Sequence, residues 1–343
     1  MKRNTILIIV FASMLLFASC GKKGQNAYQS NVTGKAGELV VVVSSEAWNA
    51  QPGIDIRNVL AQPHLSLPQE EPLFDLINIP HAAFGDIFRT SRNLLIVNIR
   101  STIDSSAVIL RRNVHAHTQA LVTIDAKNFN EFSKLFEQNA ERIAGFFIRM
   151  ERERMQLNYE RYHVKSVSNV SEELFNLKIH VPPGFKVAEQ SDDFMWIRFE
   201  TPEISQGILI YSYPYSDEKT FTPEFLVGKR NVFLRKNVPG PSPGSYMSTE
   251  MRVPVVFNQF TKSGNYAAEM RGLWRLENDF MGGPFISHSV LDMLNNRVVT
   301  IEGYVYAPSR DKRNFLRQVE AMIYSAKFTN QDEIDKINEQ YNL

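Results

Sequence analysis

Residues 266–306 read YAAEMRGLWRLENDFMGGPFISHSVLDMLNNRVVTIEGYVY, and this stretch decides the fold of the second half of the chain. Runs rich in β-branched and aromatic residues cover 266–276, 285–292 and 298–306. The short turns between them contain Gly282-Gly283-Pro284 and Asn295-Asn296. β-Branched and aromatic side chains favour strands, and tight turns favour antiparallel pairing. The pattern therefore predicts a three-stranded antiparallel meander.

The segments on either side extend this meander into a domain. Upstream, three further strands are predicted, at 175–181, 194–199 and 207–213. They precede a helix with Thr222 as its N-cap and Pro223 at its first position. Downstream, Ser309 is predicted to cap a final helix. We expect a C-terminal α+β sandwich domain over 165–328, an antiparallel sheet flanked by helices, followed by a polar tail over 329–343.

The first half of the chain has a different pattern, in which buried strands alternate with helices. Continuous apolar runs, typical of strands buried on both faces, cover 38–43, 93–99 and 120–124. Residues 128–158 form one long amphipathic pattern, which predicts a helix able to pack on its own sheet and on the next domain. We expect an N-terminal α/β domain over 37–160. The fold class is therefore α/β and α+β, in two domains.

Composition excludes several classes of protein. The 343 residues include 38 basic and 37 acidic side chains, and this near-neutral balance argues against nucleic-acid binding. A single cysteine excludes a disulfide framework and a cysteine-based zinc cluster. The chain contains no phosphate-binding loop, dinucleotide fingerprint, zinc-protease motif or EF-hand loop. We therefore expect no cofactor and no metal site.

The first twenty residues predict export and lipidation. Lys2 and Arg3 precede an apolar run over 5–18, which is shorter than the about 20 residues that a membrane-spanning helix needs. Small residues then lead into Cys20, an arrangement that resembles a lipobox. In that family of signals the peptide is cut before the cysteine, which then carries acyl chains such as palmitate. We predict a lipoprotein signal peptide over 1–19.

The residues after Cys20 indicate how the protein is presented. Residues 20–36 are polar and rich in Gly, Asn and Ser, so they predict a flexible tether between lipid and fold. Gly21 stands where an inner-membrane retention signal has Asp, and Lys22 and Lys23 stand where surface-directed lipoproteins carry acidic residues. We expect an outer-membrane lipoprotein that faces the periplasm.

Two resemblances to known families follow from these segments. The order of elements over 165–328 resembles the PsbP/Mog1-type sandwich, a fold used mostly for binding and assembly. The whole chain resembles an uncharacterised lipoprotein family of the Bacteroidota, domain of unknown function 4837. The residues that carry this resemblance are Cys20, Gly37-Glu-Leu-Val-Val41, Leu67-Pro-Gln-Glu-Glu-Pro-Leu-Phe74 and Arg92-Asn93. The resemblance implies an envelope lipoprotein and no particular activity.

Aromatic residues supply the main candidate binding surface. Tyrosines alternate along two predicted strands, so that each pair points to one face of a sheet, and two tryptophans lie in other predicted strands. Such a platform stacks on sugars or holds a partner protein, whereas ordinary half-buried sheet aromatics follow the same pattern. The set comprises Trp196, Tyr211, Tyr213, Trp274, Tyr304 and Tyr306.

An acidic segment is the second candidate for contact with a ligand or partner. Glu70 and Glu71 lie between Pro68 and Pro72, which stiffen the chain around them. A rigid acidic segment on a loop is typical of recognition sites, although adjacent carboxylates are more often surface charges. We retain both interpretations.

The remaining motifs do not predict catalysis. Residues 240–244 fit the pattern G-x-S-x-G, but Pro243 follows the serine and has no N–H to donate to an oxyanion. His115 and His117 lack a third ligand at metal-binding spacing, and His288 has no nucleophile beside it in the sequence. We therefore expect no catalytic residue.

The sequence as a whole favours a non-enzymatic, lipid-anchored envelope protein. Its membrane contact is the lipid on Cys20, and its expected role is to bind an envelope protein or to assist envelope assembly. The alternative from a different class is a module that binds glycans or small ligands through its aromatic surface. A third alternative is a hydrolase whose residues come together only in the fold.

Overall fold

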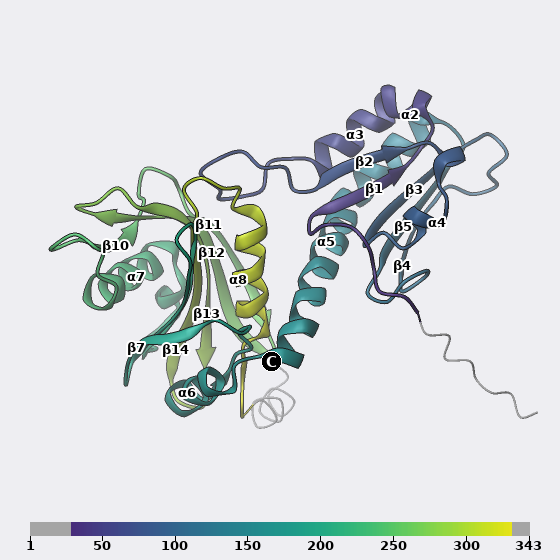
Figure 1. Ribbon diagram of the computed structural model, residues 1–343. Helices are drawn as coiled ribbons and strands as arrows, with labels where there is room; N and C mark the ends of the chain where they lie inside the picture. The colour runs from purple at the N-terminus through teal and green to yellow at the C-terminus, as the bar shows by residue number, and fades with distance from the viewer. Residues whose placement is uncertain (1–28, 331–343) are drawn as a thin grey trace, which may run out of the picture.

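The computed structural model describes residues 29–330 and shows two sheet domains connected by one long helix (Figure 1). The predicted signal peptide, Cys20 and nearly all of the predicted polar tail lie outside the described residues. The end of the predicted tether contacts the first domain, because Asn31 forms a β-bridge with His117 and Thr33 forms one with Ser91.

The N-terminal domain is built on a five-stranded sheet with the order β2-β1-β3-β5-β4. The strands β2, β1, β3 and β5 run parallel, and β4 pairs antiparallel with β5. The central strands are continuous apolar runs, and they are buried on both faces, as expected. The elements are β1 (Glu38–Val42), α2 (Ser45–Asn49), α3 (Gln51–Leu60), β2 (Asp75–Ile79), η2 (His81–Ala83), α4 (Asp86–Arg89), β3 (Asn93–Ile99), β4 (Ala107–Arg112) and β5 (Ala120–Ala126).

Helix α5 (Phe129–Tyr162) belongs to both domains. It begins at Asn128, whose side-chain oxygen accepts a hydrogen bond from the backbone N–H of Glu131. Its N-terminal part, up to about residue 150, packs Phe132, Phe136 and Phe147 into the core of the N-terminal domain. Its second half runs beside α8 (Arg313–Ser325) of the C-terminal domain (Figure 1). The long helix therefore fixes the position of the second domain relative to the first.

The C-terminal domain contains an eight-stranded antiparallel sheet with helices on both faces. The strand order is β10-β12-β13-β14-β9-β8-β7, and β11 also pairs with β12. The expected meander is confirmed as β12, β13 and β14. The strands are β7 (Lys186–Ser191), β8 (Phe194–Glu200), β9 (Ser205–Pro214), β10 (Tyr246–Thr249), β11 (Val256–Lys262), β12 (Asn265–Glu277), β13 (Gly282–Asp292) and β14 (Arg297–Tyr306).

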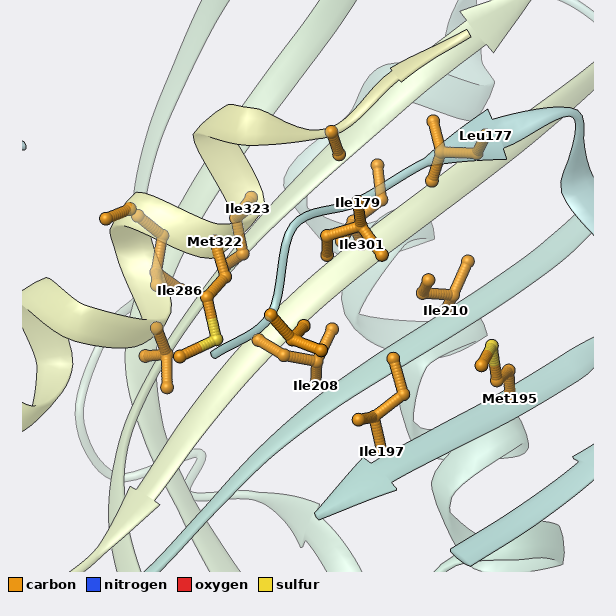
Figure 2. Close-up of a cluster of buried hydrophobic side chains, with 14 of the residues drawn as sticks. Leu177, Ile179, Met195, Ile197, Ile208, Ile210, Ile286, Ile301, Met322 and Ile323 are labelled. Carbon is orange, nitrogen blue, oxygen red and sulfur yellow. The ribbon is translucent and has the colours of Figure 1, made fainter. Parts of the chain in front are cut away.

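Two separate hydrophobic cores hold the helices on this sheet. On one face, α8 and α6 (Lys165–Phe175) cover a core of aliphatic residues, into which Met322 and Ile323 point (Figure 2). On the other face, η3 (Glu218–Phe221) and α7 (Pro223–Asn237) cover a core rich in aromatic residues. The N-cap of α7 is Thr222, as predicted, because its hydroxyl accepts from the N–H of Phe225.

Several predicted boundaries are wrong. The strand expected at 175–181 is reduced to β6 (Leu177–Lys178), which pairs with β15 (Lys327–Phe328). Phe175 instead ends α6, and Asn176 follows in the left-handed conformation with φ of 53°. A helix ending through Asn in this conformation is a common C-cap, which the apolar run 175–181 concealed. The sequence pattern also missed β7, β10 and β11, which lie at the edges of the sheet.

The cap of α8 is also different from the expected one. Ser309 does not cap the helix, which begins at Arg313 with Lys312 as its N-cap residue and no capping bond from that side chain. Instead, the carboxylate of Glu71 reaches across from the first domain and accepts from the backbone N–H groups of Lys312 and Arg313, at 2.6 and 2.8 Å. The acidic segment of the first domain thus supplies the N-terminal cap of a helix in the second.

Candidate functional site

A cavity of about 390 Å³ opens on the aromatic face of the C-terminal sheet. Strands β8, β12 and β14 contribute four of the aromatic residues singled out from the sequence. The segment that follows α7, together with Met247 and Met281, closes the wall of the cavity. The aromatic members of this wall are Trp196, Trp274, Tyr304 and Tyr306.

Two glycines allow these large rings to lie across the sheet. Gly207 of β9 is directly opposite Tyr304, and a Cβ atom at residue 207 would lie 2.2 Å from the tyrosine ring. Gly283 of β13 is opposite Trp274, and a Cβ atom there would lie 2.0 Å from the carbonyl oxygen of Val305. Both distances are shorter than any side chain permits, so these strand positions require glycine.

Hydrogen bonds hold the rings in place. The indole N–H of Trp196 donates to the hydroxyl of Tyr304 at 3.0 Å, and that of Trp274 donates to the carbonyl of Val305 at 3.2 Å. Trp274 meets Tyr304 edge to face, with ring centroids 5.6 Å apart. Burial raises the pKa of Tyr304. Because both indole N–H groups have partners inside the protein, the tryptophans offer the cavity carbon surface rather than hydrogen-bond donors.

The rim of the cavity is polar. Arg198 lies with its guanidinium carbon 4.4 Å from the ring centroid of Trp196 and forms an ion pair with Glu200. Its Nε atom is buried and has no hydrogen-bond partner within residues 29–330. Ser205 adds a hydroxyl to the same wall. The cavity therefore combines aromatic carbon surface with a guanidinium, a carboxylate and a hydroxyl.

Two of the predicted aromatic residues are not part of this cavity. Tyr211 and Tyr213 lie on the same face of the sheet, but α7 covers them, and Tyr211 stacks on Phe233 with ring centroids 4.6 Å apart. Burial raises the pKa of Tyr213 to about 12, and it also holds the pKa of Tyr211 well above its usual value. Their role is in the core, which the sequence analysis kept as the alternative.

The two acidic candidates have separate positions. Glu70 is exposed. Glu71 is only 6% exposed, because it caps α8. The recognition that Glu71 performs in this structure is intramolecular.

The third alternative, a hydrolase, is not supported by the histidine and serine positions. His288 is fully buried, with Nε2 3.0 Å from a carboxylate oxygen of Glu269 and Nδ1 3.4 Å from Nζ of Lys262. Ser242 of the G-x-S-x-G pattern bonds to Asp279 instead of a histidine. Among residues 29–330, no group of three or more His, Cys, Asp or Glu side chains is placed to hold a metal ion.

The sequence analysis missed several residues of the cavity. Arg198, Met247 and Met281 carry no motif, and residues 240–244 were considered only as a catalytic pattern. A signal for the cavity did exist, because Gly207 begins the predicted strand 207–213 and Gly283 lies two residues before the predicted strand 285–292. Glycine in a strand marks a close approach of another group.

Comparison with known sequence families gives two matches, one for each half of the chain. Residues 164–325 match the family described as domain of unknown function DUF4837. The C-terminal domain is a DUF4837 domain. Residues 32–160 match a separate family, domain of unknown function DUF8532. The DUF4837 match covers less of the chain than expected. The residues between 37 and 93 on which the resemblance was based all lie in the DUF8532 match. No curated protein matches the chain.

The solved structures that are similar to part of the chain include the following two. The Ran-binding protein Mog1p of Saccharomyces cerevisiae has 9% identity and a TM-score of 0.30, covering 45% of this chain and 90% of its own. LpqN of Mycobacterium tuberculosis, described as involved in cell envelope biogenesis, has 14% identity and a TM-score of 0.28, covering 44% of this chain and 82% of its own. Within the described part of the chain, no helix has the length and apolar character needed to cross a membrane.

Proposed function

We propose that this protein is a lipid-anchored component of the bacterial cell envelope that binds a sugar-containing ligand in the aromatic cavity of its DUF4837 domain. The lipid anchor rests on the signal pattern that ends at Cys20, and the outer-membrane location rests on Gly21, which stands where a retention signal has Asp. The observation that carries ligand binding is the aromatic cavity of about 390 Å³. Ligand cavities in proteins are commonly about 300–1,000 Å³, mostly apolar, with a few polar groups that fix orientation.

The chemistry of the wall favours a sugar over a purely apolar ligand. A pyranose ring has an apolar face that packs on aromatic carbon and hydroxyl groups that need hydrogen-bond partners. Tyr306, which is partly exposed, provides the first in front of the buried rings of Trp274 and Tyr304, while Arg198 and Glu200 provide the second. The unpartnered Nε of Arg198 supports this assignment, because a buried donor without an acceptor costs about 1–3 kcal/mol.

Binding of a partner protein is the second candidate function. Phe280, in the turn between β12 and β13, is fully exposed and precedes Met281 of the cavity wall. An exposed phenylalanine of this kind is typical of an anchor that inserts into a partner. Partner binding would place a protein surface, instead of a sugar, against the same rim.

A binding screen with matched variants tests the ligand proposal. The full chain, purified in detergent, is applied to an array of bacterial glycans that includes N-acetylglucosamine oligomers, and positive sugars are titrated by calorimetry. We expect Tyr306→Ala and Arg198→Ala to weaken binding by about tenfold or more. Tyr162→Ala, which removes an exposed tyrosine from α5, is the control and leaves affinity unchanged. Absence of any glycan ligand, or equal affinity of the three variants, contradicts the proposal.

A further inference from the structure

A second cavity, of about 410 Å³, lies between the two domains. One wall is a face of α5, another is α8, and the loop that leads into β2 closes the side. Apolar residues on this wall include Leu73, Ile148 and Met155. Ligand sites occur preferentially at interfaces between domains, where a cavity can take contributions from both.

Most charged side chains on the wall of this interdomain cavity are paired with one another. Arg271 contacts Glu269 at 2.7 Å and Glu320 at 3.2 Å, and Arg152 contacts Glu320 at 3.0 Å. These ion pairs satisfy each other and need no ligand. The charged groups of the wall that lie outside these ion pairs are therefore the candidates for contact with a ligand.

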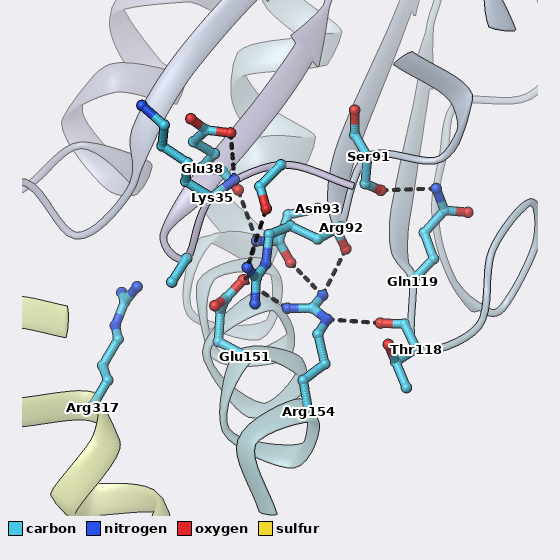
Figure 3. A network of polar contacts seen from close by, with 12 residues as sticks. Lys35, Glu38, Ser91, Arg92, Asn93, Thr118, Gln119, Glu151, Arg154 and Arg317 are labelled. Carbon is cyan, nitrogen blue, oxygen red and sulfur yellow. Dashed lines mark hydrogen bonds and ion pairs between the residues drawn. The ribbon is translucent and has the colours of Figure 1, made fainter. Parts of the chain in front are cut away.

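Glu151 of α5 is one group with an unused hydrogen-bonding atom. Its Oε1 accepts three hydrogen bonds, from Arg92 at 2.9 Å, Asn93 at 2.7 Å and Arg154 at 2.6 Å (Figure 3). Its Oε2 accepts no hydrogen bond from the described part of the chain. This atom is buried, and the whole side chain is only 1% exposed. A fully buried carboxylate oxygen without a donor is costly unless another molecule supplies one.

Arg317 of α8 is the second charged residue of the wall with an unused hydrogen-bonding atom. One terminal nitrogen, Nη2, donates to the carbonyl of Leu73, and the guanidinium lies over the ring of Phe74. The second, Nη1, is buried and has no acceptor among residues 29–330, and the residue is 5% exposed. Figure 3 shows Arg317 extending from α8 on one side and Glu151 from α5 on the other, with no contact drawn between them.

We propose that the interdomain cavity is a binding site for a small zwitterion of the amino-acid or dipeptide class. Its carboxylate accepts from Nη1 of Arg317, its ammonium group donates to Oε2 of Glu151, and an apolar side chain packs on Leu73 and Ile148. A zwitterion is favoured over a simple anion or cation because the two atoms without a hydrogen-bond partner, Oε2 of Glu151 and Nη1 of Arg317, belong to groups of opposite charge. Either simple ion would leave one of them unsatisfied.

Gly145 gives the site its space. It lies in the middle of α5, on the wall of the cavity, where glycine costs a helix about 1 kcal/mol relative to alanine. A Cβ atom there would meet only the guanidinium of Arg149, at 3.3 Å. The backbone therefore does not require glycine at this position, and a larger side chain would occupy the cavity.

Charge-capped ligands provide a test that needs no variant. The full chain in detergent is titrated by calorimetry with L-leucine, L-phenylalanine and L-alanyl-L-leucine, and then with leucinamide and N-acetyl-leucine. We expect at least one zwitterion to bind at millimolar or lower concentration. Each capped derivative, which lacks one of the two charges, should bind about tenfold more weakly or worse. The proposal is overturned if no zwitterion binds, which would indicate a cavity filled by water only. It is also overturned if the capped derivatives bind as tightly as the zwitterions.

A glycine pair provides the matched variants. Gly145→Leu fills the cavity and should abolish binding while the melting temperature stays the same or rises. Gly228→Leu makes the same change at an exposed position of α7 that has no atom within 4 Å of a Cβ, and it should bind normally. Unchanged binding by Gly145→Leu contradicts the proposal. Tyr306→Ala should leave zwitterion binding intact, so failure here and failure of the glycan proposal are distinguishable.

Discussion

Replacing Glu71 by alanine should destabilise the protein although the residue belongs to none of the hydrophobic cores. Its carboxylate accepts from two backbone N–H groups at the start of α8, from Lys312 and Arg313, and is almost completely buried. Without it, both donors lose a charged acceptor at the positive end of the helix dipole. Because the cap comes from the other domain, its loss also weakens the contact between the domains.

The size of the effect follows from the number and type of the bonds. A hydrogen bond to a charged group contributes about 1.5–3 kcal/mol, and loss of an N-cap costs about 0.5–2 kcal/mol. These contributions overlap, since the carboxylate is itself the cap. We expect Glu71→Ala to lower the free energy of unfolding by about 3 kcal/mol.

Urea unfolding followed by tryptophan fluorescence measures this difference. Glu70→Ala is the control, because it removes the neighbouring exposed carboxylate and should change the free energy of unfolding by less than about 0.5 kcal/mol. Equal stability of the two variants would refute the assignment of Glu71 as the cap of α8.

Three further predictions concern other charged groups and the lipid anchor. Arg230 is fully buried and paired with Glu302 at 2.7 Å, so Arg230→Ala should cost about 3–5 kcal/mol in urea unfolding, whereas Arg235→Ala, in the exposed part of α7, should cost less than about 0.5 kcal/mol. Burial, with a contribution from the charge of Lys262, lowers the pKa of His288 from 6.5 to about 4. The unfolded chain therefore protonates this histidine at higher pH than the folded chain, so the free energy of unfolding falls by up to about 3 kcal/mol as pH drops from about 6.5 to about 4. His288→Gln should remove this part of the pH dependence of stability, and an unchanged pH dependence would contradict the prediction. Cys20→Ala should abolish acylation and normal signal processing, as read by mass spectrometry of the N-terminus; an unacylated wild-type N-terminus would disprove the lipid anchor.

Local signals in the sequence were sufficient for much of the fold. The α7 helix was predicted correctly from Thr222 and Pro223, since a capping hydroxyl and a first-turn proline act within one turn of the chain. The parallel strands of the first domain and the meander of the second were legible because burial on both faces and tight turns each leave a continuous pattern.

Features that depend on distant residues were not predictable in the same way. The cap of α8 comes from Glu71, which lies more than two hundred positions away, so Ser309 was the only candidate that local reasoning could offer. The edge strand β7 has an exposed and polar sequence, and its pairing with β8 leaves no alternating pattern. For such edges the partner strand decides the structure.

The candidate site was predictable in kind but not in extent. Aromatic residues at alternate strand positions indicated a shared face, and Tyr304 and Tyr306 do reach the cavity. Tyr211 and Tyr213 have the same spacing, but α7 covers them. Which aromatic residues line the cavity depends on where a helix lies across the sheet. The periodicity of residues within a strand does not indicate where the helix lies.

Ligand binding in the aromatic cavity is tested most directly by photo-crosslinking in living cells. Phe280→p-benzoylphenylalanine places the reactive group on the exposed turn beside Met281 of the cavity wall. We predict capture of glycan-bearing material, and loss of that capture when Tyr306→Ala is added. Capture of a single protein species without glycan, unaffected by Tyr306→Ala, would contradict the ligand assignment and favour partner binding.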